Sequence, residues 1–171
     1  MKNLKSVVRR LSSVVPFFTT FILMATTIPR IPLEVRWSDL DPNFHLRHTV
    51  YYDYGAFCRI AYFQDKGLTP DFMQQHAIGP VLFREECTFR KEIRFGDQIT
   101  IDLQVVKLTQ DFSRWSIRHQ FWKNGDTPAA QLVVEGAWMD TVKRKLTTPV
   151  ALAQSVFEQM PRAPEFEWIK R

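Results

Sequence analysis

The chain has 171 residues, of which 45% are hydrophobic and 13% aromatic, so it can bury the core of one domain and is not a disordered segment. Its formal net charge is +5, but residues 1–23 contain Lys2, Lys5, Arg9 and Arg10 and no acidic residue. The rest of the chain therefore carries a net charge of about +1, and we expect no nucleic-acid partner.

The first 30 residues are predicted to be an N-terminal extension, basic at first and then apolar. The apolar run VVPFFTTFILMA has 12 residues, whereas a membrane-spanning helix needs about 20. No cleavage-site pattern of a signal peptide follows this run. Two interpretations remain: residues 1–23 are a membrane-associating tail, or they are an upstream extension of the reading frame before Met24.

An ordered domain is expected over residues 31–171, and it opens with a short strand. In IPLEVRW, the apolar residues Leu33, Val35 and Trp37 fall on one side, as in a strand of period two. The loop SDLDPNFHLR follows and is rich in turn-forming residues.

A helix is predicted next, from about His48 to Lys66, because Gly67 suits the first position beyond a helix C-cap. Between Val50 and Phe63 only two residues are charged. A helix that is apolar around nearly its whole circumference is buried rather than laid on a surface. We therefore expect the rest of the chain to wrap around it.

Four long strands with alternating apolar residues are predicted after the helix. They are FREECTFRKEIRF, QITIDLQVVKL, RWSIRHQFW and PAAQLVVEGAWMDTV. Short connections, including the hairpin turn KNGD, favour an antiparallel meander with one apolar and one polar face. A last helix is expected from Thr148, as N-cap, to about Met160. One helix cradled by a curved antiparallel sheet places the chain in the α+β class.

The loop before the first helix contains groups suited to attack on a carbonyl. A helix N-terminus presents unpaired backbone N–H groups with partial positive charge, which can stabilise an oxyanion. Asp41 precedes the helix start at His48 by seven residues and could activate water or attack an acyl carbon itself. The structural alternative is that Asp41 only forms a turn or caps the helix.

The stretch SDLDPNFHLRHTVYYDYGAFCRIAYF resembles the signature region of hotdog-fold acyl-CoA thioesterases of the 4-hydroxybenzoyl-CoA thioesterase-like group. That pattern is D-x-D, a loop, an aromatic or His/Asn-rich helix start and a long central helix. The FGD at 95–97, just before a strand, also fits. The resemblance covers roughly residues 31–145, and its core motif is moderately specific.

The resemblance implies a hotdog fold, in which a curved antiparallel sheet wraps a long central helix. It places the catalytic carboxylate on Asp41 and the backbone amide that polarises the thioester carbonyl on His48. It assigns substrate binding to His45 and Tyr51. The implied reaction is hydrolysis of an acyl-CoA thioester to a free acid and coenzyme A.

The resemblance also implies partners and assembly. The expected substrate is an acyl-CoA or acyl-carrier-protein thioester, and no metal or separate cofactor is expected, because coenzyme A belongs to the substrate. Hotdog domains pair edge to edge, so we expect a homodimer, or a tetramer of dimers, with the site at the interface. A cytoplasmic location is expected, with membrane contact through the N-terminal segment as an open alternative.

One departure from the family pattern keeps two further functions open. Some relatives carry H-x-N-N where this chain has HLRH, so His45 is kept and asparagines are replaced by Arg47 and His48. A non-catalytic domain that binds acyl thioesters is therefore one alternative. Hydration of an enoyl thioester is the other, because hotdog hydratases also use an aspartate and a histidine before the central helix.

Other polar residues receive structural interpretations. Asp39 is expected to brace the loop, and His119 is expected to be a structural residue within a strand. Cys58 and Cys87 are expected to be reduced core residues, because they show no metal-ligand spacing. The basic run KRK at 143–145 is either a solvated strand end or a site for the phosphates of coenzyme A.

Overall fold

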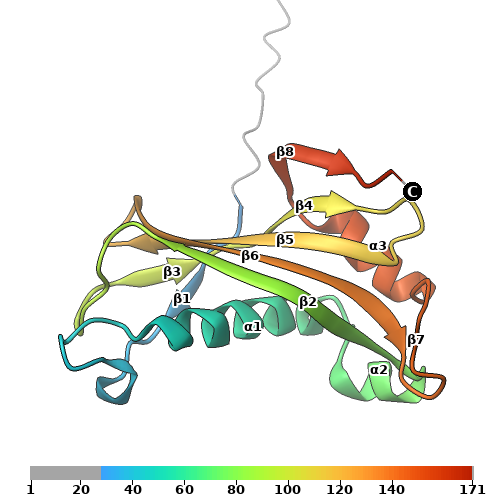
Figure 1. The fold of residues 1–171 in the computed structure, drawn as a ribbon, viewed down its shortest axis with the longest axis horizontal. Helices are drawn as coiled ribbons and strands as arrows, with labels where there is room; N and C mark the ends of the chain where they lie inside the picture. The colour runs from blue at the N-terminus through green and yellow to red at the C-terminus, as the bar shows by residue number, and fades with distance from the viewer. Residues whose placement is uncertain (1–27, 171) are drawn as a thin grey trace, which may run out of the picture.

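The computed structural model describes residues 28–170, so the interpretations of residues 1–23 lie outside the described residues. Figure 1 shows a curved sheet with one long helix, α1, beneath it. Within the described range, no helix has the length and apolarity needed to cross a bilayer. The elements in chain order are β1 (Ile31–Leu33), η1 (Trp37–Asp39), α1 (His48–Asp65), α2 (Pro70–Gln75), β2 (Ile78–Phe89), β3 (Ile99–Ile101), β4 (Gln104–Leu108), β5 (Arg114–Lys123), β6 (Thr127–Asp140), β7 (Lys145–Leu146), α3 (Ala151–Gln159) and β8 (Arg162–Trp168).

The sheet is antiparallel except for one strand pair. β2 pairs with β6, β6 with β5, and β5 with both β3 and β4. β1 extends the sheet from β3, β7 pairs with the end of β6, and β8 runs parallel to β4. The predicted meander is therefore wrong in one respect: β2 lies beside β6, the last of the four long strands, and not beside β3. Alternation along a strand specifies its two faces but not its neighbours.

The C-terminal end of α1 follows from the local sequence. Gly67 has φ +80°, and its N–H bonds the Gln64 carbonyl at 3.0 Å. The N–H of Leu68 bonds the Phe63 carbonyl at 2.9 Å, and both of these side chains are buried. This is a Schellman motif. The prediction that the helix ends at Gly67 is confirmed.

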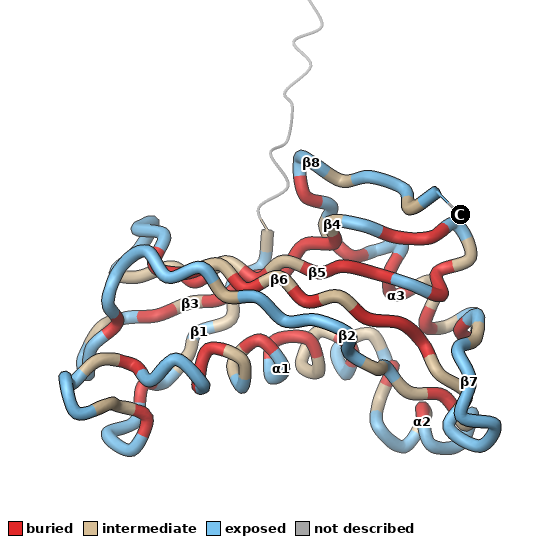
Figure 2. The backbone as a smooth tube through the Cα atoms, viewed as in Figure 1, coloured by how far each residue is buried: buried red, intermediate tan, exposed pale blue. Residues whose placement is uncertain are grey.

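The position of α1 on the sheet depends on a glycine. A Cβ atom placed on Gly55 would lie 2.3 Å from Cδ2 of Leu132 on β6. The helix backbone therefore approaches the sheet so closely that a side chain at this position must displace the end of Leu132. The opposite side of α1 is open to solvent in the described chain, and Phe57 is 54% exposed. Burial around the whole helix is not observed, because the sheet covers one side only (Figure 2).

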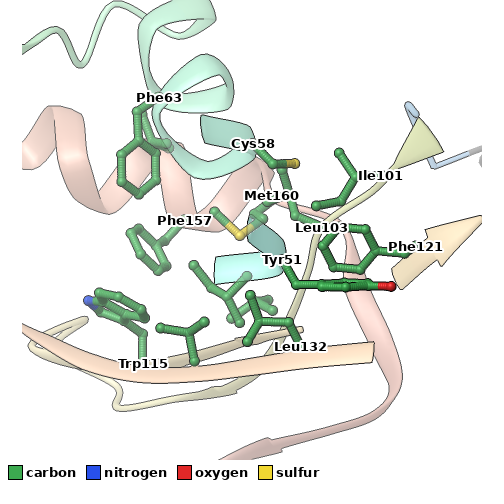
Figure 3. Packing of buried hydrophobic residues seen from close by; sticks show 14 of the residues in the cluster. Tyr51, Cys58, Phe63, Ile101, Leu103, Trp115, Phe121, Leu132, Phe157 and Met160 are labelled. Atoms are coloured by element: carbon green, nitrogen blue, oxygen red, sulfur yellow. The ribbon is translucent and has the colours of Figure 1, made fainter. Parts of the chain in front are cut away.

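The core lies between the sheet and the helices. Phe157 of α3 packs against Phe63 of α1 and Trp115 of β5, with both ring-centroid distances 5.9 Å (Figure 3). At the other end of α1, Tyr51 packs edge-on against Phe121 at 5.2 Å. Both helices thus cover the same face of the sheet, and the N-terminal end of α1 is fixed by aromatic contacts.

Several predicted boundaries are wrong. β1 is shorter than expected, and Trp37 is 66% exposed in η1 rather than on the apolar side of a strand. β2 begins earlier, at Ile78, and ends before Ile93. The N-cap of α3 is Val150 rather than Thr148. The helix α2 and the strand β8 were not predicted.

The segment predicted as one strand over 98–108 is divided into β3 and β4 around Asp102. The Asp102 carbonyl accepts a hydrogen bond from Nδ1 of His119 at 3.1 Å, and its side chain accepts one from Nε1 of Trp122 at 2.7 Å. Asp102 and Gln104 were expected on a polar face, but both are buried. β8 pairs with β4 at the edge of the sheet, and the Gln104 amide donates to the Arg162 carbonyl at 3.3 Å.

Candidate functional site

The loop before α1 is organised around the side chain of Asp41. Its Oδ1 accepts hydrogen bonds from the backbone N–H groups of Asn43 at 2.8 Å and His45 at 3.0 Å. The Asp41 N–H donates to the His45 carbonyl at 2.8 Å, and the Phe44 N–H donates to the Asp41 carbonyl at 2.9 Å. Phe44 is held at φ +62°, a strained conformation for a bulky residue. One carboxylate oxygen therefore fixes the whole turn.

The second oxygen of Asp41 has a different environment. Within residues 28–170, no hydrogen bond to Oδ2 is found. The hydrogen bond from the His45 N–H, with smaller contributions from the backbone N–H and the side chain of Asn43, holds the pKa of Asp41 below its usual value. The carboxylate is thus ionised at neutral pH, and no backbone N–H of the described residues donates to its Oδ2.

The start of α1 supplies hydrogen-bond donors close to this carboxylate. The helix begins at His48, and no side chain caps it. The Val50 N–H bonds the Arg47 carbonyl at 3.0 Å, but within the described part of the chain the N–H groups of His48 and Thr49 have no acceptor. These groups, at the positive end of an 18-residue helix, can bind an oxygen that gains negative charge.

The predicted site residues line one pocket. Asp41, His45, His48 and Tyr51 surround a cavity of about 360 Å³. The remaining lining residues come from the loop before α1, from the end of β2 and from the segment after it, and they are Leu46, Phe89, Arg90, Lys91, Glu92 and Ile93. The pocket thus combines a carboxylate, a helix N-terminus and an apolar wall.

The imidazole of His45 forms an ion pair with Glu92 rather than a hydrogen bond with Asp41. Its Nε2 lies 3.2 Å from Oε2 of Glu92, and the His45 backbone pairs with Arg94 in an isolated β-bridge. The backbone N–H of His45 therefore orients Asp41, and its imidazole fixes the loop to the segment after β2.

Tyr51 forms part of the inner wall of the pocket. It is buried, and its ring packs edge-on between Phe89 at 5.0 Å and Phe121 at 5.2 Å. Burial raises the pKa of the Tyr51 phenol far above its usual value, so this side chain is neutral at physiological pH.

Asp39 has the bracing role expected of it. The Arg36 guanidinium donates to both carboxylate oxygens at 2.9–3.0 Å, and the Arg36 backbone N–H donates to Oδ2 at 3.0 Å. The Asp39 carbonyl accepts the Arg47 N–H at 2.9 Å, which ties η1 to the start of α1. These bonds from Arg36 hold the pKa of Asp39 below its usual value. Because Asp39 is buried and saturated, it is not available for chemistry.

The sequence did not indicate the contribution of residues 89–93. They lie more than 40 positions after the loop, and the Leu46 N–H bonds the Ile93 carbonyl at 2.7 Å to join the two segments. The basic run at 143–145 is elsewhere: Lys143 pairs with Asp140 at 3.5 Å in a turn whose Thr141 N–H bonds the Ala77 carbonyl, beside α2.

Comparison with known proteins assigns the fold and the family. The model of the thioesterase-like superfamily matches residues 35–168. The chain belongs to the thioesterase-like superfamily. The curled antiparallel sheet with α1 against one face matches the hotdog-like fold of these thioesterases. A search among curated proteins gives no match.

Three solved structures illustrate this relationship. A Thermus thermophilus thioesterase complexed with coenzyme A and Zn is 25% identical, with a TM-score of 0.63 over 75% of this chain and 90% of that one. A Staphylococcus aureus protein in complex with CoA is 17% identical, with a TM-score of 0.70 over 78% and 86%. A 1,4-dihydroxy-2-naphthoyl-CoA thioesterase from Synechocystis is 11% identical, with a TM-score of 0.69 over 76% and 95%.

Proposed function

We propose that this member of the thioesterase-like superfamily hydrolyses acyl-CoA thioesters to the free acid and coenzyme A. The observation that carries the proposal is that the Asp41 carboxylate and the uncapped N-terminus of α1 at His48 belong to one pocket. The coenzyme A in two similar structures supports the choice of carrier. Thioester hydrolysis needs a group that delivers oxygen to the acyl carbon and donors for the resulting oxyanion.

The chemistry can follow either of two balanced routes. As a general base, Asp41 takes a proton from water while the water oxygen adds to the acyl carbon. The carbon–sulfur bond then breaks, and the thiolate of coenzyme A takes up a proton. As a nucleophile, Asp41 adds to the carbon and displaces the thiolate, and water hydrolyses the resulting anhydride. In both routes the N–H groups at His48 stabilise the oxyanion.

The substrate is proposed to lie with its thioester carbonyl at the start of α1 and its acyl group toward Tyr51. Phe89 and Tyr51 provide an apolar wall there. His45 supports this wall indirectly, through its contact with Glu92.

A non-catalytic acyl-thioester-binding domain is the second candidate. The observation that favours it is that Arg47 and His48 stand at the helix start where some relatives carry two asparagines. A panel of acyl-CoAs assayed with a thiol reagent separates the candidates, because hydrolysis releases a free thiol and binding does not. The absorbance of an enoyl thioester reports hydration in the same panel. Hydrolysis of at least one acyl-CoA is expected. Binding without thiol release would contradict the proposal.

We also propose that the protein forms a homodimer, or a tetramer of dimers, through β2. This strand has 12 residues, and within residues 28–170 it pairs only with β6, so its other edge is open. Leu82, Phe83 and Phe89 are exposed along it. A long open edge with exposed apolar side chains favours pairing with another chain. Light scattering should give at least twice the protomer mass of 20.2 kDa.

A further inference from the structure

The loop that carries Asp41 is clamped through its backbone to the segment between β2 and β3. The Leu46 N–H donates to the Ile93 carbonyl at 2.7 Å, and His45 forms an isolated β-bridge with Arg94. This clamp joins two parts of the chain that lie far apart in sequence, beside the candidate pocket. It fixes the loop only as firmly as the segment is itself held.

The side chain of Glu92 reinforces the clamp from the segment. Its Oε2 lies 3.2 Å from Nε2 of His45 and 2.9 Å from Nη2 of Arg94, so one oxygen contacts both residues of the β-bridge. The hydrogen bond from Arg94, and then the charge of His45, hold the pKa of Glu92 below its usual value. The carboxylate of Glu92 is thus ionised at neutral pH.

The segment is anchored in turn to the hairpin between β5 and β6. Nζ of Lys123 donates to the Glu92 carbonyl at 2.7 Å and pairs with Asp97 at 2.8 Å. The Asp97 carboxylate also accepts the Arg94 N–H at 2.7 Å and the side-chain amide of Asn124 at 3.1 Å. The backbone that carries Glu92 is therefore held in place.

His45 connects this anchored segment to Asp41. The His45 N–H donates to Oδ1 of Asp41 at 3.0 Å, and the His45 carbonyl accepts the Asp41 N–H at 2.8 Å. A displacement of His45 therefore moves the carboxylate relative to the helix start at His48. A misplacement of about 1 Å at a reacting group can cost roughly 10²-fold in rate.

We propose that Glu92 is a positioning residue of the candidate site: by holding the imidazole of His45, it aims the Asp41 carboxylate at the thioester carbonyl. The proposal rests on the proposed function, because it takes Asp41 as the group that delivers oxygen to the acyl carbon. Glu92 acts through His45 and not on the reacting atoms, so its removal should change the catalytic step rather than substrate binding. An exposed ion pair contributes little to stability, so the fold should survive the change.

Steady-state kinetics of the full-length Glu92→Ala variant test this role. In a thiol-release assay with an acyl-CoA, kcat should fall by roughly tenfold and KM should change by less than about twofold. Glu167→Ala is the matched control. The Glu167 side chain is 60% exposed, against 58% for Glu92, and it pairs with Lys107 on β4, away from the pocket. Its removal should leave kcat unchanged.

A double-mutant cycle with His45→Ala shows whether Glu92 acts through His45. The two single variants break the same contact, so their effects on kcat should not multiply. The double variant should therefore lie within about threefold of His45→Ala alone. Effects that multiply, or a loss confined to KM, would overturn the proposal.

A carbon-13 NMR titration of the Asp41 carboxyl group makes the test independent of turnover, with the signal assigned by its absence in Asp41→Asn. The hydrogen bond from the His45 N–H is the largest cause of the lowered pKa of Asp41. A loosened clamp should therefore raise this pKa toward its usual value in Glu92→Ala and leave it unchanged in Glu167→Ala. Loss of the Glu92 charge by itself acts in the opposite sense, because removing a nearby anion lowers the pKa of a carboxyl group.

The outcomes of the titration separate the clamp from the reaction. An Asp41 pKa that is unchanged or lower in Glu92→Ala would overturn the proposal. A parent protein that releases no thiol, but whose Asp41 pKa rises in Glu92→Ala, would support the positioning of Asp41 by Glu92 and contradict the hydrolase.

Discussion

Lowering the pH should destabilise the protein through His119. This side chain is fully buried, its Nδ1–H donates to the Asp102 carbonyl at 3.1 Å, and its Nε2 accepts from Nη1 of Arg59 at 3.2 Å. Because Arg59 can only donate, both hydrogen bonds require the neutral ring. Burial, and then the charge of Arg59, lower the pKa of His119 from 6.5 to about 3.

The sign and size of the effect follow from linkage. Between pH 6.5 and about 3 the unfolded chain binds a proton at His119 and the folded protein does not. The stabilisation is therefore complete above pH 6.5 and is lost as the pH falls toward 3. Each pH unit in this window costs about 1.4 kcal/mol of unfolding free energy, which gives about 2 kcal/mol between pH 7.5 and pH 5. Asp102, whose pKa is raised by burial, acts in the opposite sense.

Urea unfolding of the parent and of His119→Gln at pH 7.5, 6 and 5 measures this effect. The variant cannot take up the proton, so its unfolding free energy should fall by about 2 kcal/mol less than that of the parent over this range. It should also be less stable at pH 7.5, because one amide cannot replace both ring hydrogen bonds. Equal pH dependence in the two proteins would refute the reasoning.

Three further predictions concern stability and assembly. Gly55→Ala gains about 1 kcal/mol of helix propensity but must displace Leu132 at a cost of about 1–3 kcal/mol. Urea unfolding should therefore show net destabilisation, and a stabilised variant would contradict the packing. Asp39→Asn should lower the thermal midpoint, because the bonds from Arg36 weaken, yet reduce kcat/KM less than a change at Asp41; equal losses of activity would argue against a bracing role. Phe83→Lys on the open edge of β2 should shift the light-scattering mass toward the 20.2 kDa protomer, and an unchanged mass would place the interface elsewhere.

The elements that the sequence predicted well are those specified by neighbouring residues. Gly67 adopts positive φ at the end of α1, and Asn124 and Gly125 adopt positive φ in the hairpin turn of KNGD. Alternation along β5 correctly places Trp115 and His119 on the buried face. In each case a local backbone requirement or a period of two residues is enough to specify the structure.

The features that escaped prediction depend on distant partners. The pairing of β2 with β6 and the hydrogen bond from Gln104 to the Arg162 carbonyl of β8 involve residues far apart in the chain. The helix α2 is an exception: it was not predicted, although its own sequence contains the signals of a helix start. Thr69 accepts the Phe72 N–H at 3.1 Å as N-cap, and Pro70 follows at the first helical position.

The candidate site likewise consists of one part that the sequence predicted and one part that it did not. Asp41, His45, His48 and Tyr51 are close in sequence, so one loop and one helical turn bring them together. The other wall of the pocket comes from residues 89–93, which reach it through a backbone hydrogen bond and a β-bridge. No sequence period connects these two segments, and a structure was needed to join them.

Asp41→Asn tests the central claim most directly. An asparagine can keep Oδ1 as acceptor for the N–H groups of Asn43 and His45, so the loop should survive while the free carboxylate oxygen is replaced. In a thiol-release assay with the best acyl-CoA, kcat should fall by about 10²–10⁴-fold with little change in KM. His48→Ala, which keeps the backbone N–H, should cost less. An Asp41→Asn protein that folds normally and retains activity within about threefold of the parent would contradict the mechanism and leave Asp41 as a turn-forming residue.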